Sequence, residues 1–301
     1  MRTSRTGTPI RTNRRKASAG RRSGFTLVEL LVVISIIAVL LTILLPSLQA
    51  AKQQAQGVLC VAHLRSLSMV WTMYADDNEG RMVGGCASYL PGPPGYPWVV
   101  APLNKWGWSK PNGTRSVDGS GGDAVTLEDR LRGIRAGALF AYTDNNTDIY
   151  HCPGDKRMYE GTYLGDTLVH QLYRSYTIQL GLNGGPPKAL KRVSSIKQPE
   201  EMYVFVEEYY DGGVFNAAWG FNLDPINWPG GWWSTVAVWH NDSSTLGFAD
   251  GHAERKVWQD ERTIDLAYCR STEGWYQPDN LDLQYLMQRY AIQGDLKWYE
   301  W

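Results

Sequence analysis

The hydrophobic pattern opens with a long apolar run from Phe25 to Leu45, in which Glu29 is the one charged residue. The run is 21 residues long. As a helix it would extend about 31 Å, which matches the hydrocarbon core of a membrane. We therefore predict a transmembrane helix over residues 25–45.

A second helical pattern follows Pro46. Residues 49–74 contain no proline, and one stripe recurs at helical spacing, formed by Leu59, His63, Leu67, Val70 and Tyr74. We predict that an amphipathic half, residues 46–78, continues the membrane helix. One face of this half would pack on a globular domain over residues 79–301.

The rest of the pattern predicts short strands and two further helices. Residues 126–142 read as a helix with Thr126 as N-cap, and residues 278–293 as a closing helix with Asp279 as N-cap. Strands are predicted over 149–155, 173–180 and 202–209. Residues 84–122 are rich in Gly, Pro and Trp, and read as a loop-rich surface feature. The expected fold class is α+β, a long N-terminal helix packed on an antiparallel sheet.

Residues 235–258 predict a hairpin. Two strands flank the polar loop 241–244, and Asp250-Gly251 suits a type I′ turn. A metal or catalytic set of His240, Asp250 and His252 is the alternative. In a simple hairpin, however, Asp250 would lie about 16 Å from His240. We therefore interpret these residues as structural.

Charge places the segments on opposite sides of a membrane. Eight basic residues and no acidic residue lie in the leader, residues 1–24. The positive-inside rule then predicts a cytoplasmic N-terminus and an extracytoplasmic C-terminal domain. The whole chain has no net formal charge, so without its basic leader the remainder is acidic. An acidic exported domain argues against a nucleic-acid partner, although a basic tail alone would allow one.

The four cysteines are Cys60, Cys86, Cys152 and Cys269. They allow three pairings. We predict that Cys60 and Cys152 approach each other, because Cys60 lies on the packing half of the helix and Cys152 lies beside a turn. There is no CxxC or HExxH pattern, so no metal and no cofactor are expected.

Two ligand alternatives stay open. Residues 144–148 carry oxygen side chains at alternate positions, as calcium loops do, but they lack the loop glycine and the closing glutamate, which favours a solvated turn. The 13 tryptophans, many in 98–108 and 219–239, fit either a sugar-binding surface or a core. No nucleophile–base pair or pair of carboxylates indicates an enzyme.

The segment Gly24-Phe25-Thr26-Leu27-Val28-Glu29-Leu30 resembles the cleavage and methylation motif of type IV pilins and type II secretion pseudopilins. The resemblance implies that prepilin peptidase cuts between Gly24 and Phe25, and that Phe25 becomes the methylated N-terminus. It implies that Glu29 pairs with the N-terminal amine of a neighbouring subunit. Pro46 matches the proline that breaks the helix at the periplasmic end of the span. The alternative is an ordinary anchor whose glutamate reaches the interface.

Three later segments resemble a prepilin-processing-associated subgroup of these proteins. They are Cys60–Leu67 with Tyr74–Arg81, the Cys152-Pro153-Gly154-Asp155 stretch, and His240 followed after nine residues by Asp250-Gly251, the H-X9-DG pattern. The resemblance implies a pilin-like filament subunit that works with other pilin-like subunits, assembly machinery and a membrane. The alternative is a membrane-tethered extracytoplasmic binding module, with glycans as one candidate ligand.

Overall fold

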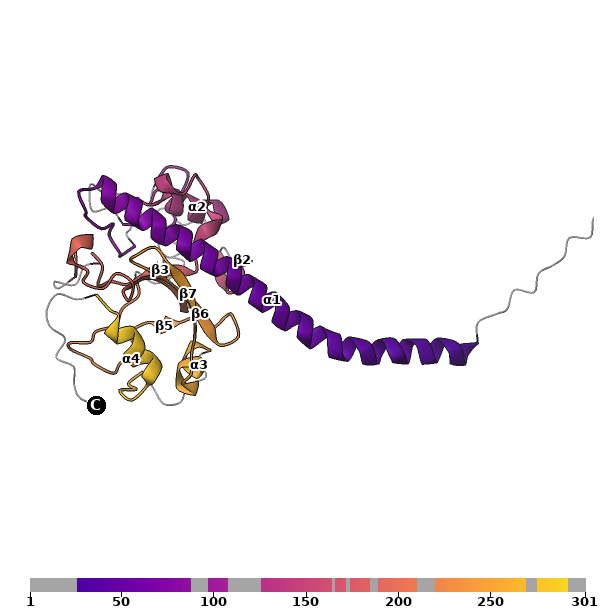
Figure 1. Cartoon of the computed structure of the whole chain (residues 1–301). Coiled ribbons are helices and arrows are strands. Elements are labelled where there is room, and N and C mark those ends of the chain that lie inside the picture. The colour runs from indigo at the N-terminus through magenta and orange to yellow at the C-terminus, as the bar shows by residue number, and fades with distance from the viewer. Residues whose placement is uncertain are drawn as a thin grey trace, which may run out of the picture. The chain divides into compact units, whose positions relative to one another are not determined.

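The computed structural model describes residues 26–87, 97–107, 126–163, 166–171, 174–184, 189–209, 220–268 and 275–291 (Figure 1). The side chains of 158–163 and 166–171 are not among those described. Contacts divide the chain into two compact units, Met1–Leu48 and Gln49–Trp301. Each unit is described by itself.

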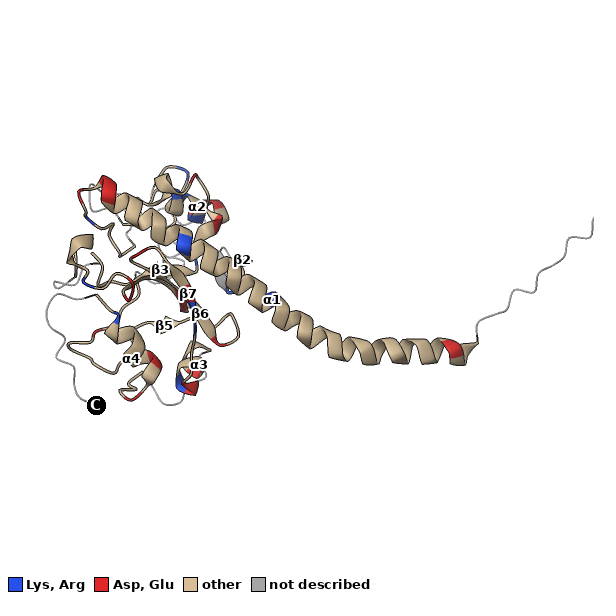
Figure 2. Cartoon of the chain, viewed as in Figure 1, with Lys and Arg blue, Asp and Glu red and all other residues tan. Residues whose placement is uncertain are grey.

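The first unit contains the N-terminal part of helix α1 (Leu27–Asp77), which is long and apolar enough to cross a membrane. Its side chains as far as Leu48 are exposed, and Glu29 is the acidic residue of its first turn (Figure 2). Pro46 lies inside α1, so the predicted helix break is not a helix end. A proline removes only one backbone hydrogen-bond donor from a helix, and an exposed helix can bend locally to make room for the proline ring. The helix therefore continues past Pro46.

In the second unit, α1 buries one stripe of side chains, which includes Cys60, Leu64, Leu67, Trp71 and Tyr74. The predicted Leu67, Val70 and Tyr74 are buried, whereas the predicted Leu59 is 47% exposed. Contact with the sheet decides which positions of the helix are buried. A Cβ atom at Gly247 would meet Ser68 Oγ and the carbonyl oxygen of Leu64, so α1 packs directly on the sheet backbone there.

An antiparallel sheet forms the centre of the second unit. Strand β4 (Tyr203–Tyr209) pairs with β3 (Tyr176–Ile178), β6 (Ser243–Phe248) and β5 (Thr235–Val236), and β6 pairs with β7 (Ala253–Val257). Every residue of β6 is buried. The long helix on this sheet confirms the predicted α+β, pilin-like fold.

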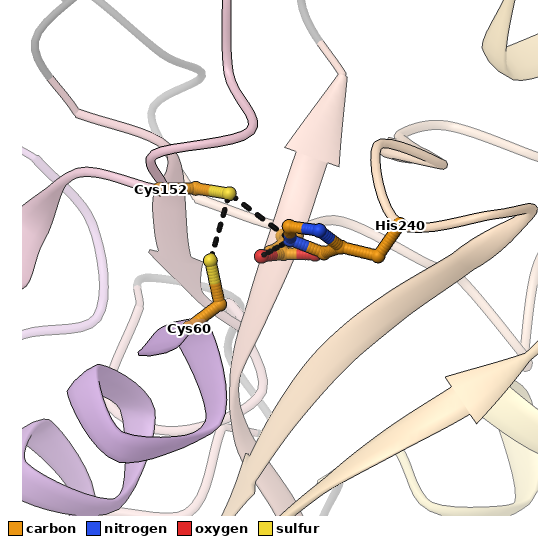
Figure 3. A group of neighbouring side chains, drawn as sticks. Cys60, Cys152 and His240 are labelled. Atoms are coloured by element: carbon orange, nitrogen blue, oxygen red, sulfur yellow. Dashed lines mark hydrogen bonds and ion pairs between the residues drawn. The ribbon is translucent and has the colours of Figure 1, made fainter. Parts of the chain in front are cut away.

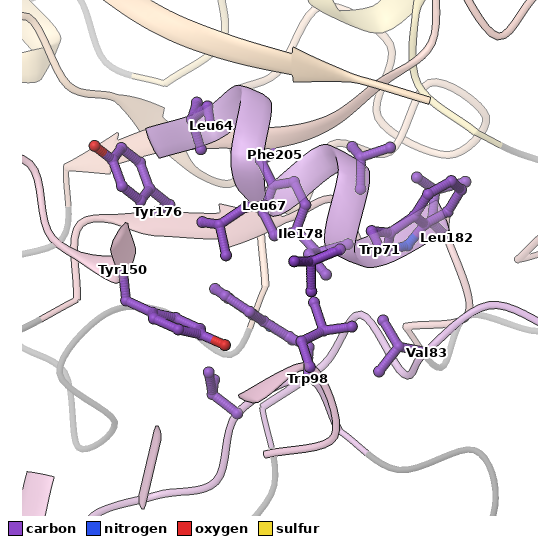
Figure 4. Close-up of a cluster of buried hydrophobic side chains, with 14 of the residues drawn as sticks. Leu64, Leu67, Trp71, Val83, Trp98, Tyr150, Tyr176, Ile178, Leu182 and Phe205 are labelled. Carbon is purple, nitrogen blue, oxygen red and sulfur yellow. The ribbon is translucent and has the colours of Figure 1, made fainter. Parts of the chain in front are cut away.

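Two hydrophobic clusters flank the sheet. The first joins the α1 stripe to sheet residues such as Ile178 and Phe205, and it includes Trp98 and Tyr150 (Figure 4). The second joins the sheet to α3 (Glu261–Ala267) and α4 (Leu281–Gln288). The N-cap of α4 is Asn280, whose side chain accepts from two backbone N–H groups, rather than the predicted Asp279.

The segments between α1 and the sheet differ from the prediction. Thr126 caps α2 (Leu127–Arg135) in a complete capping box with Asp129, but the helix stops before a separate 3-10 turn, η1 (Phe140–Tyr142). At Gly137 the backbone approaches Trp98 too closely for any side chain. Trp98 is fully buried, so part of the predicted surface loop 84–122 belongs to the core. Residues 88–96 and 108–125 lie outside the described part.

Three shorter elements complete the second unit. The strand predicted over 149–155 is wrong, because the chain forms the 3-10 turn η2 (Asp148–Tyr150) there. A separate ladder joins β1 (Met158–Tyr163) and β2 (Asp166–Gln171). Another 3-10 turn, η3 (Val193–Ser195), precedes β4.

The predicted 235–258 hairpin is formed by β6 and β7 alone. β5 pairs with β4, and His240 lies in the turn between β5 and β6. The type I′ assignment at Asp250-Gly251 is wrong, because Gly251 has φ +92° while Asp250 is not a positive-φ residue. Consecutive positive φ values occur instead at Asn241 and Asp242. The tight bend there turns His240 into the interior.

Candidate functional site

The first candidate site is the start of α1. The Thr26 N–H and hydroxyl both donate to Glu29 Oε2 at 2.8 Å, and the Glu29 N–H donates back to Thr26 Oγ1 at 3.2 Å. This is a capping box, which satisfies backbone donors at the helix start. This local role of Thr26 and Glu29 was not predicted, although the Thr-x-x-Glu spacing is the usual signal of a capping box. Gly24 and Phe25 lie outside the described residues.

The second candidate site is a buried cluster of thiols, an imidazole and a carboxylate. Cys60 Sγ and Cys152 Sγ lie 2.8 Å apart, and Cys152 Sγ lies 3.1 Å from His240 Nε2 (Figure 3). The same nitrogen lies 3.1 Å from Glu207 Oε1. All four side chains are fully buried, and their ligand atoms lie within 4.8 Å of one another.

Four distant segments position these side chains. Cys60 belongs to the packing stripe of α1, and Glu207 to the central strand β4. Cys152 follows η2, where its N–H donates to Ser175 Oγ at 3.0 Å and its sulfur accepts from the Gly154 N–H at 3.2 Å. The second oxygen of Glu207 accepts from the Thr245 N–H at 2.9 Å, so backbone hydrogen bonding fixes the carboxylate.

The pKa values of the two thiols are shifted in opposite directions. Burial raises the pKa of Cys152, and the neighbouring Cys60 and Glu207 raise it further. Burial also acts to raise the pKa of Cys60, but hydrogen bonds from Cys152 and His240 outweigh it and lower the pKa. Burial would lower the pKa of His240, yet contact with Cys60 and Glu207 raises it to about 10. Of the two thiols, Cys60 therefore ionises more readily, and contact with Cys60 and Glu207 favours the protonated form of His240.

The cluster can support two kinds of chemistry. Two sulfurs in contact can form a disulfide, and two sulfurs with an imidazole and a carboxylate can also hold a soft divalent cation. The cluster is closed to solvent, so catalysis on a large substrate has no route to it in this conformation.

The structure joins some predicted residues and separates others. His240, Cys60 and Cys152 meet in one place. Asp250 and His252 instead contact each other, with Asp250 Oδ1 and His252 Nδ1 2.5 Å apart at a partly exposed turn. Sequence reasoning missed Glu207. The signal was present, since Glu207 and Glu208 are two adjacent charges within an otherwise apolar strand.

A third feature is an aromatic pocket of about 420 Å³, lined by Trp228, Trp232, Trp233 and Trp275. Trp228 and Trp233 meet edge to face with ring centroids 5.1 Å apart. Trp232 is buried and donates from Nε1 to Gln277 Oε1 at 3.1 Å, whereas Trp233 is 56% exposed. The tryptophans of this region therefore serve both the core and an open surface.

The predicted calcium alternative falls on a turn with its own internal hydrogen bonding. Asp144 and Asn145 both have positive φ, and Asn146 Oδ1 accepts from the Asp148 N–H at 2.9 Å. Calcium binding there stays a prediction.

Comparison with known proteins bears on the N-terminal segment. A family model described as the prokaryotic N-terminal methylation motif matches residues 20–45. The chain is similar to the type IV wide pilus major component PilA4 of Thermus thermophilus, with 46% identity over 56 residues. This match covers 19% of the chain and 43% of the pilin, so it spans less than half of the relative's length. No solved structure matches the chain.

These findings agree with the fold. The chain is prepilin-like, with an N-terminal methylation motif, and its described residues include one helix that is long and apolar enough to cross a membrane. The motif and the relative together mark a likeness to type IV pilins over part of the chain.

Proposed function

We propose that this protein is a pseudopilin-like structural subunit of a type II secretion or type IV pilus-like filament. In this proposal prepilin peptidase cuts between Gly24 and Phe25, and the new N-terminus is methylated. The methylation motif over residues 20–45 is the observation that carries the proposal. The exposed apolar half of α1 supports it, because such a surface needs lipid or neighbouring helices to cover it.

Orientation follows from charge. The basic leader would stay in the cytoplasm, and the domain from Gln49 onward would lie on the extracytoplasmic side. The chain would then meet the peptidase, the assembly machinery and other pilin-like subunits at the membrane.

Glu29 would have two successive roles. In the single chain its carboxylate is held by Thr26. In a filament the same carboxylate would pair with the N-terminal amine of a neighbouring subunit. An unpaired charge in hydrocarbon is costly, so this pairing would fix one axial stagger of packed helices.

Two substitutions separate the two roles. Glu29→Gln keeps a side chain that can complete the capping box but removes the charge. Thr26→Ala removes the capping side chain and keeps the charge. We expect Glu29→Gln to be cleaved and inserted normally but lost from sheared filaments or cross-linked oligomers. Thr26→Ala should still assemble.

The measurement is the amount of each variant in the filament fraction relative to the membrane fraction, by immunoblot in the native host. Normal incorporation of Glu29→Gln would count against the proposed pairing. Loss of Thr26→Ala together with normal incorporation of Glu29→Gln would assign the role of this pair in assembly to helix capping alone.

The aromatic pocket favours a second candidate, a tethered module that binds a ligand with a flat apolar face, such as a sugar ring. Full-length protein in detergent can be tested on a glycan array, with Trp233→Ala as the pocket variant. Trp106→Ala is the matched control, because Trp106 is 73% exposed and does not line the pocket. Binding that Trp233→Ala loses and Trp106→Ala keeps would support this candidate.

A further inference from the structure

We propose that Cys60 and Cys152 close to a disulfide in the mature protein and so fasten the second half of α1 to the sheet domain. The proposal rests on the export described under Proposed function, because disulfides persist in oxidising compartments and are rare in the cytoplasm. It assigns the buried cluster a mechanical role rather than a role in ligand binding.

Contact and burial carry the proposal. The two sulfurs lie 2.8 Å apart although their residues are 92 positions apart in the chain. Both side chains are fully buried, so neither is open to exchange with a thiol in solution once the chain is folded. Each sulfur is held on its own element, Cys60 within α1 and Cys152 by the hydrogen bonds of the turn after η2. The folded structure therefore holds the two sulfurs close enough to accommodate a bond between them.

A soft cation such as Zn²⁺ is the competing occupant, and two observations argue against it. Two thiolates on one tetrahedral zinc, each bonded at about 2.3 Å, would lie about 3.8 Å apart. The cluster would have to open to reach that separation. In addition, the Nδ1 atom of His240 has no hydrogen-bond partner among the described residues. A zinc-bound histidine nearly always donates its second ring nitrogen to an acceptor.

The chemistry balances with a disulfide-bearing oxidant of the exported compartment. The Cys60 thiolate attacks one sulfur of the oxidant, which forms a mixed disulfide and releases one thiol. Cys152 loses its proton and attacks the sulfur of Cys60, which releases the second thiol. Two electrons and two protons pass to the oxidant, which ends as a dithiol. Because both sulfurs are buried in the folded chain, this exchange precedes the final packing of α1.

After oxidation the other two members of the cluster remain paired. His240 Nε2 keeps its contact with Glu207 Oε1, and Glu207 keeps the Thr245 N–H. The disulfide thus closes one side of the cluster, and the contact between His240 and Glu207 closes the other.

The test is thiol mapping of the full-length protein from its native host. Cells are lysed directly in denaturant that contains N-ethylmaleimide, so that buried free thiols are alkylated as the chain unfolds, and the purified protein is digested without reductant and analysed by mass spectrometry. We expect a linked pair of peptides containing Cys60 and Cys152 in most chains, which separates after dithiothreitol. Alkylation of both residues, or stoichiometric zinc in the same sample, would overturn the disulfide.

Cysteine variants and N-terminal sequencing extend this test. Cys86→Ser should keep the linkage, and Cys60→Ala should leave Cys152 free to alkylate; a new linkage of Cys152 to another cysteine would contradict the assignment. N-terminal sequencing of the same sample separates the two proposals. A chain cleaved after Gly24 with both thiols free overturns the disulfide alone. A cross-linked chain that still begins at Met1 overturns the processing alone, and an uncleaved chain with free thiols overturns both.

Discussion

The imidazole of His240 occupies the space that a side chain at Gly154 would need, since a Cβ atom there would lie 2.7 Å from His240 Cε1. Gly154 belongs to the turn that carries Cys152, so this close approach sets the distance between the thiol and the imidazole. On the other side of the ring, a Cβ atom at Gly57 of α1 would lie 3.5 Å from His240 Cγ, which is an ordinary contact.

The two glycines therefore predict opposite effects. Gly154→Ala should destabilise the protein by about 1–3 kcal/mol, because His240 is buried and has no room to retreat. Gly57→Ala should be neutral or stabilising by up to about 1 kcal/mol, because alanine is the better helix former. Denaturant unfolding of the full-length protein in detergent, followed by tryptophan fluorescence, measures both. Equal destabilisation by the two variants would contradict the geometry of the cluster.

Removing the proposed disulfide should lower stability. Cys60→Ala/Cys152→Ala should cost about 2–4 kcal/mol against the oxidised wild type, the usual range for a disulfide that closes a long loop. Wild type reduced with dithiothreitol should fall to a similar value. Cys86→Ala is the control and should change little. A reductant-insensitive wild type would argue that no disulfide is present.

Gly251 tests the turn after β6. Its φ is +92°, and the nearest atom to an added Cβ is Met69 Cγ at 3.8 Å, so backbone strain rather than collision decides the effect. Gly251→Val should cost about 1 kcal/mol or more. Gly251→Asn should cost less, because asparagine adopts positive φ more readily. Thermal unfolding of wild type, Gly251→Val and Gly251→Asn measures these losses of stability. Equal losses for valine and asparagine would rule out backbone strain as the cause.

Glu208 predicts a pH dependence. Burial raises its pKa from 4.5 to about 7, although Ser234 and Arg174 act to lower it. An acid whose pKa is higher in the folded state gives its full stabilisation below the unfolded pKa and loses it as pH rises through the folded value. As the pH rises from about 4.5 to about 7, the melting temperature of Glu208→Gln should therefore increase relative to that of wild type. Above about pH 7 this difference should stay constant. Glu254→Gln, at an exposed strand position, should follow wild type. A constant difference across this range would contradict the prediction.

The last prediction concerns cleavage of the leader by prepilin peptidase. Gly24→Val should block cleavage, because the peptidase acts directly after this residue in the proposed scheme. The protein should then accumulate in the membrane with its basic leader attached, detectable as a larger band and by N-terminal sequencing. Normal cleavage of Gly24→Val, or a mature N-terminus inside the apolar run, would show that the leader ends elsewhere.

Much of this architecture is visible in the sequence because its signals are local. A 21-residue apolar run identifies a membrane helix without reference to the rest of the chain. Thr126 and Asp129 form the capping box that their spacing indicates, because a helix cap involves only neighbouring residues. The β4 strand was also visible, since its apolar residues are consecutive.

Features that depend on contact between distant segments were misplaced or missed. The buried stripe of α1 includes the predicted Leu67, Val70 and Tyr74, but Cys60 and Leu64 are buried in place of Leu59 and His63, because the helix meets the sheet at Gly247. The turn after β6 has a single positive-φ residue, and the pair of positive φ values lies instead at Asn241 and Asp242. Turn type depends on the register of the flanking strands, which the residues of the turn do not encode alone.

By itself the sequence determined the membrane helix, the prepilin motif and the α+β class, because hydrophobic length, a short linear motif and strand periodicity are properties of contiguous residues. Only the tertiary structure decided that Cys60, Cys152, Glu207 and His240 form one buried cluster. These four residues come from a helix, two turns and a strand, separated by up to 180 positions in the chain. Their convergence follows from how α1 packs on the sheet, and that packing is a collective result of many buried side chains.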